Sequence, residues 1–111
     1  MKKLIIGNWK MNPDTKVEAQ RIIAAVKKAA TKLARTSVVL CPPFVYMPLV
    51  AGRGTSSVAL GAQDVAPEAQ GSYTGEVSAN MLRDSGAAYA IIGHSERRAM
   101  GETDESISRK V

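Results

Sequence analysis

The chain has 111 residues, of which 45% are hydrophobic and 23% are charged, with a formal net charge of +5. This composition is typical of soluble globular proteins and excludes collagen-like and strongly disordered chains. The length predicts one domain over residues 1–111, with a small core. No stretch approaches the roughly 18 consecutive apolar residues of a membrane span, and the N-terminus lacks the apolar core of a signal peptide. We therefore expect a cytoplasmic location and no membrane partner.

Much of the positive charge lies on one predicted amphipathic helix, from about Thr15 to Arg35. A charged face on such a helix ordinarily faces solvent, and no basic cluster is interleaved with aromatic residues that would stack bases. The charge therefore predicts no nucleic-acid partner. The basic face comprises Lys16, Arg21, Lys27, Lys28, Lys32 and Arg35, and the apolar face comprises Val17, Ile22, Ile23, Val26, Ala30 and Leu33.

Short apolar runs alternate with helical patterns along the chain. This βαβ order predicts an α/β fold with parallel strands joined by right-handed crossovers. The predicted strands are Lys3 to Gly7, Ser37 to Cys41, Val58 to Gln63 and Ala87 to Ile92. The predicted helices are about Thr15 to Arg35, Tyr46 to Gly52 and Ser78 to Ser85.

A fourth helix is predicted to begin near the end of the sequence. Thr103 offers an N-cap oxygen, and Asp104 and Glu105 place negative charge in the first turn, where the helix dipole favours it. Ile107 begins an apolar stripe. We therefore expect about four parallel strands with three helices and the start of a fourth.

Polar side chains follow the first and fourth predicted strands directly. Asn8 and Lys10 come after the first strand, and His94 and Glu96 come after the fourth. The stretch Ala88 to Ile92 is continuously apolar, which predicts a strand buried on both faces of a parallel sheet. Because ligands bind at the carboxyl ends of parallel strands, we expect these four side chains to share one site.

Five motifs occur along the chain, two that follow the first and fourth predicted strands and three that lie between them. The outer two are Gly7-Asn8-Trp9-Lys10-Met11-Asn12 and Gly93-His94-Ser95-Glu96-Arg97-Arg98, and the inner three are Cys41-Pro42-Pro43-Phe44, Gly61-Ala62-Gln63-Asp64 and Tyr73-Thr74-Gly75-Glu76-Val77-Ser78. Together they resemble the triosephosphate isomerase family from Met1 to Val111. The resemblance implies a TIM barrel, an eight-stranded (β/α) barrel of about 250 residues. The chain is expected to be its N-terminal half, a half barrel.

The resemblance also implies an activity, the interconversion of dihydroxyacetone phosphate and glyceraldehyde 3-phosphate in glycolysis and gluconeogenesis, by proton transfer through an enediolate. It implies that His94 is the neutral electrophile that hydrogen-bonds the substrate carbonyl, a role already described for this enzyme family. Lys10 is then the cation that holds the phosphate, with Asn8 beside it and with Glu96 and Ser95 in supporting roles. No metal and no organic cofactor is implied. Without the resemblance, a lone histidine is more often structural and a lysine is more often solvated.

Two of the residue assignments have simpler alternatives. Glu96 is expected to pair with Lys10, and a surface ion pair with Arg97 or Arg98 is the alternative. Cys41 is expected to be a small buried hydrophobe rather than a nucleophile, because the chain has no second histidine to activate it.

The segment Asp64 to Gly75 is longer than an ordinary connection, which is typical of functional loops. In the family this segment is the dimer loop. The resemblance therefore implies an interface formed by Tyr73, Thr74 and Glu76, with Thr74 at the tip of the loop. Gln63 matches an inner-barrel position.

Several parts of the family's site have no counterpart in these residues. The family's catalytic base follows the sixth strand, its mobile lid comes next, and backbone amides after the seventh and eighth strands hold the phosphate. Losing general-base catalysis alone removes a factor of about 10² to 10⁴ in rate. We therefore expect the chain alone to be inactive.

A half barrel has open sheet edges, and its inner face lies uncovered. A second copy or a complementing C-terminal half barrel would cover both surfaces. The chain is therefore expected to act with a triose phosphate substrate once it is completed, or to form a homo-oligomer. An alternative function is a non-catalytic, self-associating half-barrel assembly module.

Overall fold

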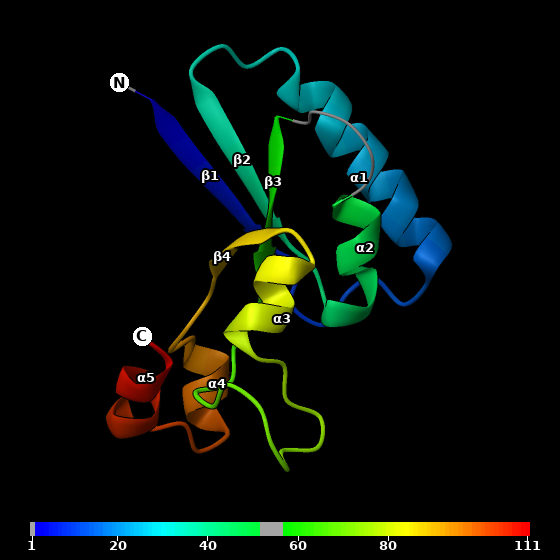
Figure 1. Cartoon of the computed structure of the whole chain (residues 1–111). Coiled ribbons are helices and arrows are strands. Elements are labelled where there is room, and N and C mark those ends of the chain that lie inside the picture. The colour runs from blue at the N-terminus through cyan, green and yellow to red at the C-terminus, as the bar shows by residue number, and fades with distance from the viewer. Residues whose placement is uncertain (1, 52–56) are drawn as a thin grey trace.

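The computed structural model describes residues 2–51 and 57–111 (Figure 1). Four strands form one sheet in the order β1-β2-β3-β4, and each neighbouring pair is parallel. The α/β prediction is therefore confirmed. The strands are β1 (Lys3–Asn8), β2 (Thr36–Cys41), β3 (Val58–Ala62) and β4 (Ala87–Ala90).

Helices connect the strands and follow the last one. The helices α1 and α2 contact each other and lie over β3, while α3 packs against β4 (Figure 1). Within the described residues, no helix combines the length and apolar character needed to cross a membrane. The elements are α1 (Lys16–Ala30), a 3-10 helix η1 (Phe44–Tyr46), α2 (Met47–Val50), α3 (Ala79–Asp84), α4 (Ser95–Ala99) and α5 (Asp104–Lys110).

Two helix predictions need correction. The first helix ends at Ala30 and not at Arg35, because Thr31 caps it and its hydroxyl donates to the Lys28 carbonyl at 2.7 Å. The described residues also contain a short separate helix, α4, before α5, which the prediction of three helices and the start of a fourth did not include. Five residues are too few to show a helical period in the sequence. The predicted end of the second helix at Gly52 lies outside the described residues.

The core lies between the two central strands and the helices that cover them. Residues of β2 and β3 are buried against α1, α2 and α3 because the sheet presents its apolar side chains to apolar helix faces. Trp9 and Ile92 pack against this core from the strand ends while remaining partly exposed. The buried core residues include Ile23, Ala30, Val38, Leu40, Met47, Val50, Val58, Leu60, Ala62, Val65 and Leu82.

The two edge strands are much more exposed than the central ones. In β1, Leu4, Ile5 and Ile6 keep 48%, 53% and 52% of their surface exposed. In β4, Tyr89 is 44% exposed and its neighbours are exposed as well. The prediction that this strand is buried on both faces is wrong, because within the described residues no further strand pairs with β4.

The close contact between β2 and β3 requires a glycine at position 61. A Cβ added to Gly61 would lie 2.5 Å from the Cys41 Sγ atom and 3.0 Å from a Val39 methyl group. Both neighbours are buried, so neither has open space to move into. Position 61 also follows the register shift between β3 and β4.

We predict that Gly61→Ala lowers the free energy of unfolding by about 1–3 kcal/mol, the usual effect of overpacking a core. Denaturant titration followed by circular dichroism measures this loss. The Cys41→Ala change removes the closest clashing atom, so the double variant should recover part of the loss. Strict additivity of the two single changes would show that the clash is not the cause.

Candidate active site

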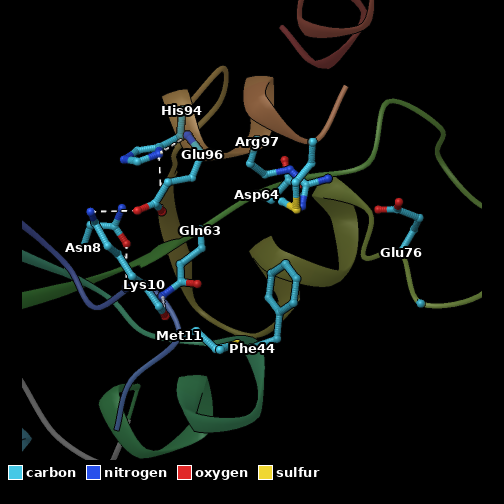
Figure 2. A pocket seen from close by; sticks show the side chains of 12 residues that line it. Asn8, Lys10, Met11, Phe44, Gln63, Asp64, Glu76, His94, Glu96 and Arg97 are labelled. Atoms are coloured by element: carbon cyan, nitrogen blue, oxygen red, sulfur yellow. Dashed lines mark hydrogen bonds and ion pairs between the residues drawn. The ribbon is translucent and has the colours of Figure 1, made fainter. Parts of the chain in front are cut away.

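A pocket of about 300 Å³ lies at the carboxyl ends of the strands (Figure 2). The structure brings Asn8, Lys10, His94 and Glu96 together on one side of it, from the ends of β1 and β4. The parallel sheet explains this convergence, because all four strands end at the same edge. The lining residues are Asn8, Lys10, Met11, Phe44, Gln63, Asp64, Gly75, Glu76, His94, Glu96, Arg97 and Met100.

Lys10 and Glu96 form an ion pair, with 2.8 Å between Nζ and Oε1 (Figure 2). The hydrogen bond from Lys10 holds the pKa of the Glu96 carboxyl below its ordinary value, and the charge of Lys10 acts in the same direction. The predicted pairing with Lys10 is therefore present in place of the alternative pair with Arg97 or Arg98. The pair directs the ammonium group into the pocket mouth, where it is half exposed.

His94 is both the N-cap of α4 and a lining residue of the pocket. Its Nδ1 atom accepts a hydrogen bond from the Glu96 backbone N–H at 3.1 Å. In the neutral imidazole, the proton must then sit on Nε2, which is left as a donor. The 3.7 Å separation between Nδ1 and the Glu96 carboxylate becomes an ion pair only when the ring is protonated. The geometry therefore matches a neutral hydrogen-bond donor.

The backbone of Lys10 is held in the left-handed region, with φ of +56°. Few residues other than glycine adopt this conformation, so surrounding contacts must enforce it. The Lys10 N–H donates to Asn8 Oδ1 at 2.9 Å, and its carbonyl accepts from Gln63 Nε2 at 2.7 Å. Side chains from the ends of β1 and β3 thus fix both peptide groups of the lysine.

Gln63 is the positioning residue that the sequence did not reveal. Its Nε2 atom donates to two carbonyls, those of Lys10 and, at 2.9 Å, of Cys41. It therefore joins the loop after β1 to the end of β2. The sequence showed only an amide at the end of a predicted strand and its match to an inner-barrel position of the family, and neither identifies the groups that the amide bonds.

A second group of charges fixes α4 and α5 beside the pocket. Arg97 lies 3.2 Å from Asp64 and 3.1 Å from Glu102. Lys110 lies 2.7 Å from Asp64 and 3.3 Å from Glu102. The side chains of Lys110 and Glu102 are only 8% and 5% exposed, so these charges are well shielded from water. We call these four residues the charge cluster.

The pKa shifts within the charge cluster show that attraction outweighs burial. Burial alone would raise the pKa of Glu102, yet its bonds to Arg97 and Lys110 lower it below the ordinary value. Burial alone would lower the pKa of Lys110, yet Asp64 and Glu102 raise it. Both shifts favour the charged forms of Glu102 and Lys110, and the ion pairs of the cluster tie the chain after β3 to the last helix.

The loop before α3 contributes to the other side of the pocket. The Glu76 N–H donates to the Tyr73 carbonyl at 3.0 Å, which closes a turn with Thr74 at its tip. Gly75 has a φ of +91° in this turn. Figure 2 places Glu76 across the pocket from the pair of Lys10 and Glu96. The interface role of Tyr73, Thr74 and Glu76 stays a prediction.

The remaining candidates lie outside the pocket or carry no reactive arrangement. Cys41 is fully buried, and burial raises the pKa of its thiol, as expected of a small buried hydrophobe. Ser95 is exposed at the first residue of α4. Over residues 2–51 and 57–111, no group of three or more histidine, cysteine, aspartate or glutamate side chains is placed to hold a metal ion.

Comparison with known proteins identifies the family to which this arrangement of residues belongs. A family model described as triosephosphate isomerase matches residues 3–111. The chain belongs to the triosephosphate isomerase family. The motif-based family prediction is therefore confirmed, and the four parallel strands form part of a TIM-barrel fold.

Individual relatives agree with the family match. The chain is 47% identical to the triosephosphate isomerase of Roseiflexus castenholzii and 44% identical to that of Endomicrobium trichonymphae, each over 111 residues. It is 44% identical to the enzyme of Moorella thermoacetica over 110 residues. These alignments cover 97–98% of this chain but only 43–44% of each relative. The chain thus spans less than half the length of these relatives.

We predict that the Glu96 carboxyl titrates below its ordinary value near 4.5, because Lys10 donates a hydrogen bond to it. The Lys10→Met change should raise this midpoint, and Gln63→Leu should raise it partway by releasing the Lys10 backbone. Carbon-13 NMR titration of the glutamate carboxyls measures these midpoints. A carboxyl with a lowered folded-state pKa stabilises the fold above about pH 4.5, and this contribution disappears as pH falls through the lower value.

The matched control is Lys16→Met, which removes an exposed ammonium from α1 and should leave the Glu96 midpoint unchanged. If Lys10→Met leaves the Glu96 midpoint unchanged, the assigned ion pair is wrong. If Lys10→Met raises the midpoint but Gln63→Leu does not, the positioning role of Gln63 is wrong.

Proposed function

We propose that these residues supply the electrophilic side of triosephosphate isomerase catalysis when the remaining β/α units of the barrel are present. The observation that carries this proposal is the bond between His94 Nδ1 and the Glu96 N–H. It leaves Nε2–H as a donor in the pocket that also holds the Lys10 ammonium. A neutral donor and a cation together suit a phosphorylated carbonyl compound.

The two groups would act on different parts of a triose phosphate. The His94 Nε2–H donates to the carbonyl oxygen, and this hydrogen bond strengthens as negative charge develops in the enediolate. The Lys10 ammonium attracts the phosphate dianion and adds positive potential near that oxygen. Asn8 and Gln63 hold the lysine in place, which contributes orientation before any reaction begins.

The proposed chemistry needs a base from beyond these residues. Glu96 and Asp64 line the pocket, but each is already bound to cations, Lys10 in the first case and Arg97 and Lys110 in the second. Such pairing occupies both carboxylates, and in Glu96 it also lowers the pKa. We therefore propose that the chain alone does not turn over substrate. The setting of this chemistry is the cytoplasm, where a single buried cysteine such as Cys41 stays reduced.

A single-chain hybrid tests the proposal directly. Residues 1–111 would be continued by the remaining length of the Moorella thermoacetica relative, which is 44% identical over the shared part. We predict isomerase activity in the hybrid and none in residues 1–111 alone. In the hybrid, His94→Gln should lower kcat by about 10² or more, the usual effect of losing one preorganised donor. Lys10→Ala should lower kcat and raise KM, because it binds the phosphate in both states.

The control is Lys32→Ala, which removes an exposed charge beyond the end of α1 and should leave both constants unchanged. A folded hybrid that keeps full activity with His94→Gln would refute the electrophile assignment. Substantial turnover by residues 1–111 alone that His94→Gln abolishes would refute the need for an external base.

A further inference from the structure

The chain bends at Gly93, immediately before the proposed electrophile His94. Strand β4 ends at Ala90, and the Ile91 N–H still donates to the Ala62 carbonyl at 2.9 Å. Gly93 then takes a φ of +67°, in the left-handed region that favours glycine. The direction in which the chain leaves the sheet is therefore set by the contacts of this bend and not by strand pairing alone.

Arg98, in the last turn of α4, holds the carbonyl of Gly93. Its Nε atom donates to the Gly93 carbonyl oxygen at 3.3 Å. This oxygen belongs to the same planar peptide group as the His94 nitrogen. Holding the oxygen therefore fixes the plane from which the His94 side chain projects.

Helix α5 holds the other end of this guanidinium. The Arg98 Nη1 atom donates to Asp104 Oδ1 at 2.7 Å, at the first residue of α5. The side chains of Arg98 and Asp104 are 47% and 88% exposed, so as an isolated ion pair they would add little stability. The effect of the pair is geometric, because one rigid, planar guanidinium joins an acid of α5 to the carbonyl that precedes His94.

A second contact from α5 lies against Gly93 itself. A Cβ added to Gly93 would lie 3.2 Å from Ile107 Cδ1 and 3.4 Å from Ile107 Cγ2, so the isoleucine covers the open side of the glycine. Arg97 of α4 and Lys110 of α5 both pair with Glu102, which keeps the two helices together (Figure 1). Contacts from α5 therefore reach the bend at two points, the carbonyl oxygen and the α-carbon.

We propose that Arg98, anchored by Asp104, is a positioning residue for His94. The guanidinium fixes the Gly93 peptide, and the fixed peptide keeps His94 Nδ1 on the Glu96 N–H, so that the Nε2–H group keeps its direction. A misplacement of about 1 Å can cost about 10² in rate. The catalytic consequence of this inference rests on the proposed function, whereas its geometric part concerns these residues alone.

Two substitutions separate donation to Gly93 from the other effects of Arg98. Glutamine carries an amide nitrogen as far along its side chain as the arginine Nε, so Arg98→Gln keeps a donor for the carbonyl but gives up the anchor on Asp104. Methionine has a similar length and no donor, so Arg98→Met loses both bonds. The matched control is Arg21→Met, which removes an exposed arginine of α1 that pairs with Glu18 at 3.4 Å.

The readout is the hydrogen bond from the Glu96 N–H to His94 Nδ1, because His94 is the single histidine of the chain. Nitrogen-15 NMR at about pH 8, where ordinary histidines are neutral, detects the coupling between the two nitrogens across this bond. We predict that Arg98→Met abolishes the coupling and speeds exchange of the Glu96 amide hydrogen on the order of tenfold. Arg98→Gln should lose less, and Arg21→Met should change neither quantity.

The anchor is tested from α5. Asp104→Asn removes the charge that holds the guanidinium, so it should weaken the same coupling partway. Glu105→Gln is the matched control, because it removes an exposed charge from the same first turn of α5, and it should leave the coupling unchanged. Equal effects of the two changes would show that the charge acts on the helix dipole and not on Arg98, which would overturn the proposal.

The hybrid with the Moorella thermoacetica relative measures the catalytic consequence. Arg98→Met should lower kcat on the order of tenfold with little change in KM, because Lys10 still binds the phosphate and the His94 donor acts in the transition state. Arg98→Gln should recover part of this loss. An inactive hybrid would refute the proposed function, and the NMR comparison, which needs no turnover, would still decide the positioning role.

The NMR outcomes divide cleanly. A coupling that Arg98→Met abolishes and Arg98→Gln partly keeps supports the proposal. A coupling that survives in Arg98→Met, or that Arg98→Gln loses as fully, shows that Arg98 does not act through the Gly93 carbonyl. If circular dichroism shows that Arg98→Met is unfolded, the comparison of Asp104→Asn with Glu105→Gln decides.

Discussion

The parallel alignment of the four strands determines where every polar group of the pocket lies. Because the strands point the same way, the residues that follow them gather at one edge of the sheet. Gln63, after β3, reaches the carbonyls of Lys10 and Cys41 only because β1 and β2 end at the same level. A single shift in strand register would separate these groups by about 3.3 Å per residue, beyond hydrogen-bond reach. Strand register is thus a constraint on the site as well as on the core.

The sequence predicted the features that depend on local patterns. Apolar runs bounded by turn residues located all four strands, and the polar residues after the first and last strand indicated the edge where the pocket lies. Local patterns gave a wrong prediction where contacts with residues distant in the sequence determine whether a side chain is buried. The exposure of Tyr89 follows from the absence of a neighbouring strand beyond β4 among the described residues, and nothing within the strand itself reveals this.

The positioning contacts show the same limit. The bond between Gln63 and Lys10 joins residues 53 positions apart, and the pair of Lys110 and Asp64 joins residues 46 positions apart. One sequence gives no measure of such proximity, because amides and charges are common after strands and on helices. By contrast, the pair of Lys10 and Glu96 was predictable once two strand ends were placed on one edge. The topology therefore brings side chains of separate motifs close together, and the length of each side chain then determines which contacts form.

The orientation of Lys10 and His94 in the pocket and the pairing of the outer strands depend on different interactions. The bonds that orient Lys10 and His94 come from Asn8, Gln63 and the first turn of α4, all within these residues. None of them involves the outer edges of β1 or β4, whose apolar side chains are exposed among the described residues. The geometry of Lys10 and His94 is therefore fixed by local strand ends and by the first turn of α4. In the proposed function, these groups are thus held in their reactive geometry independently of the base that the remaining units would supply.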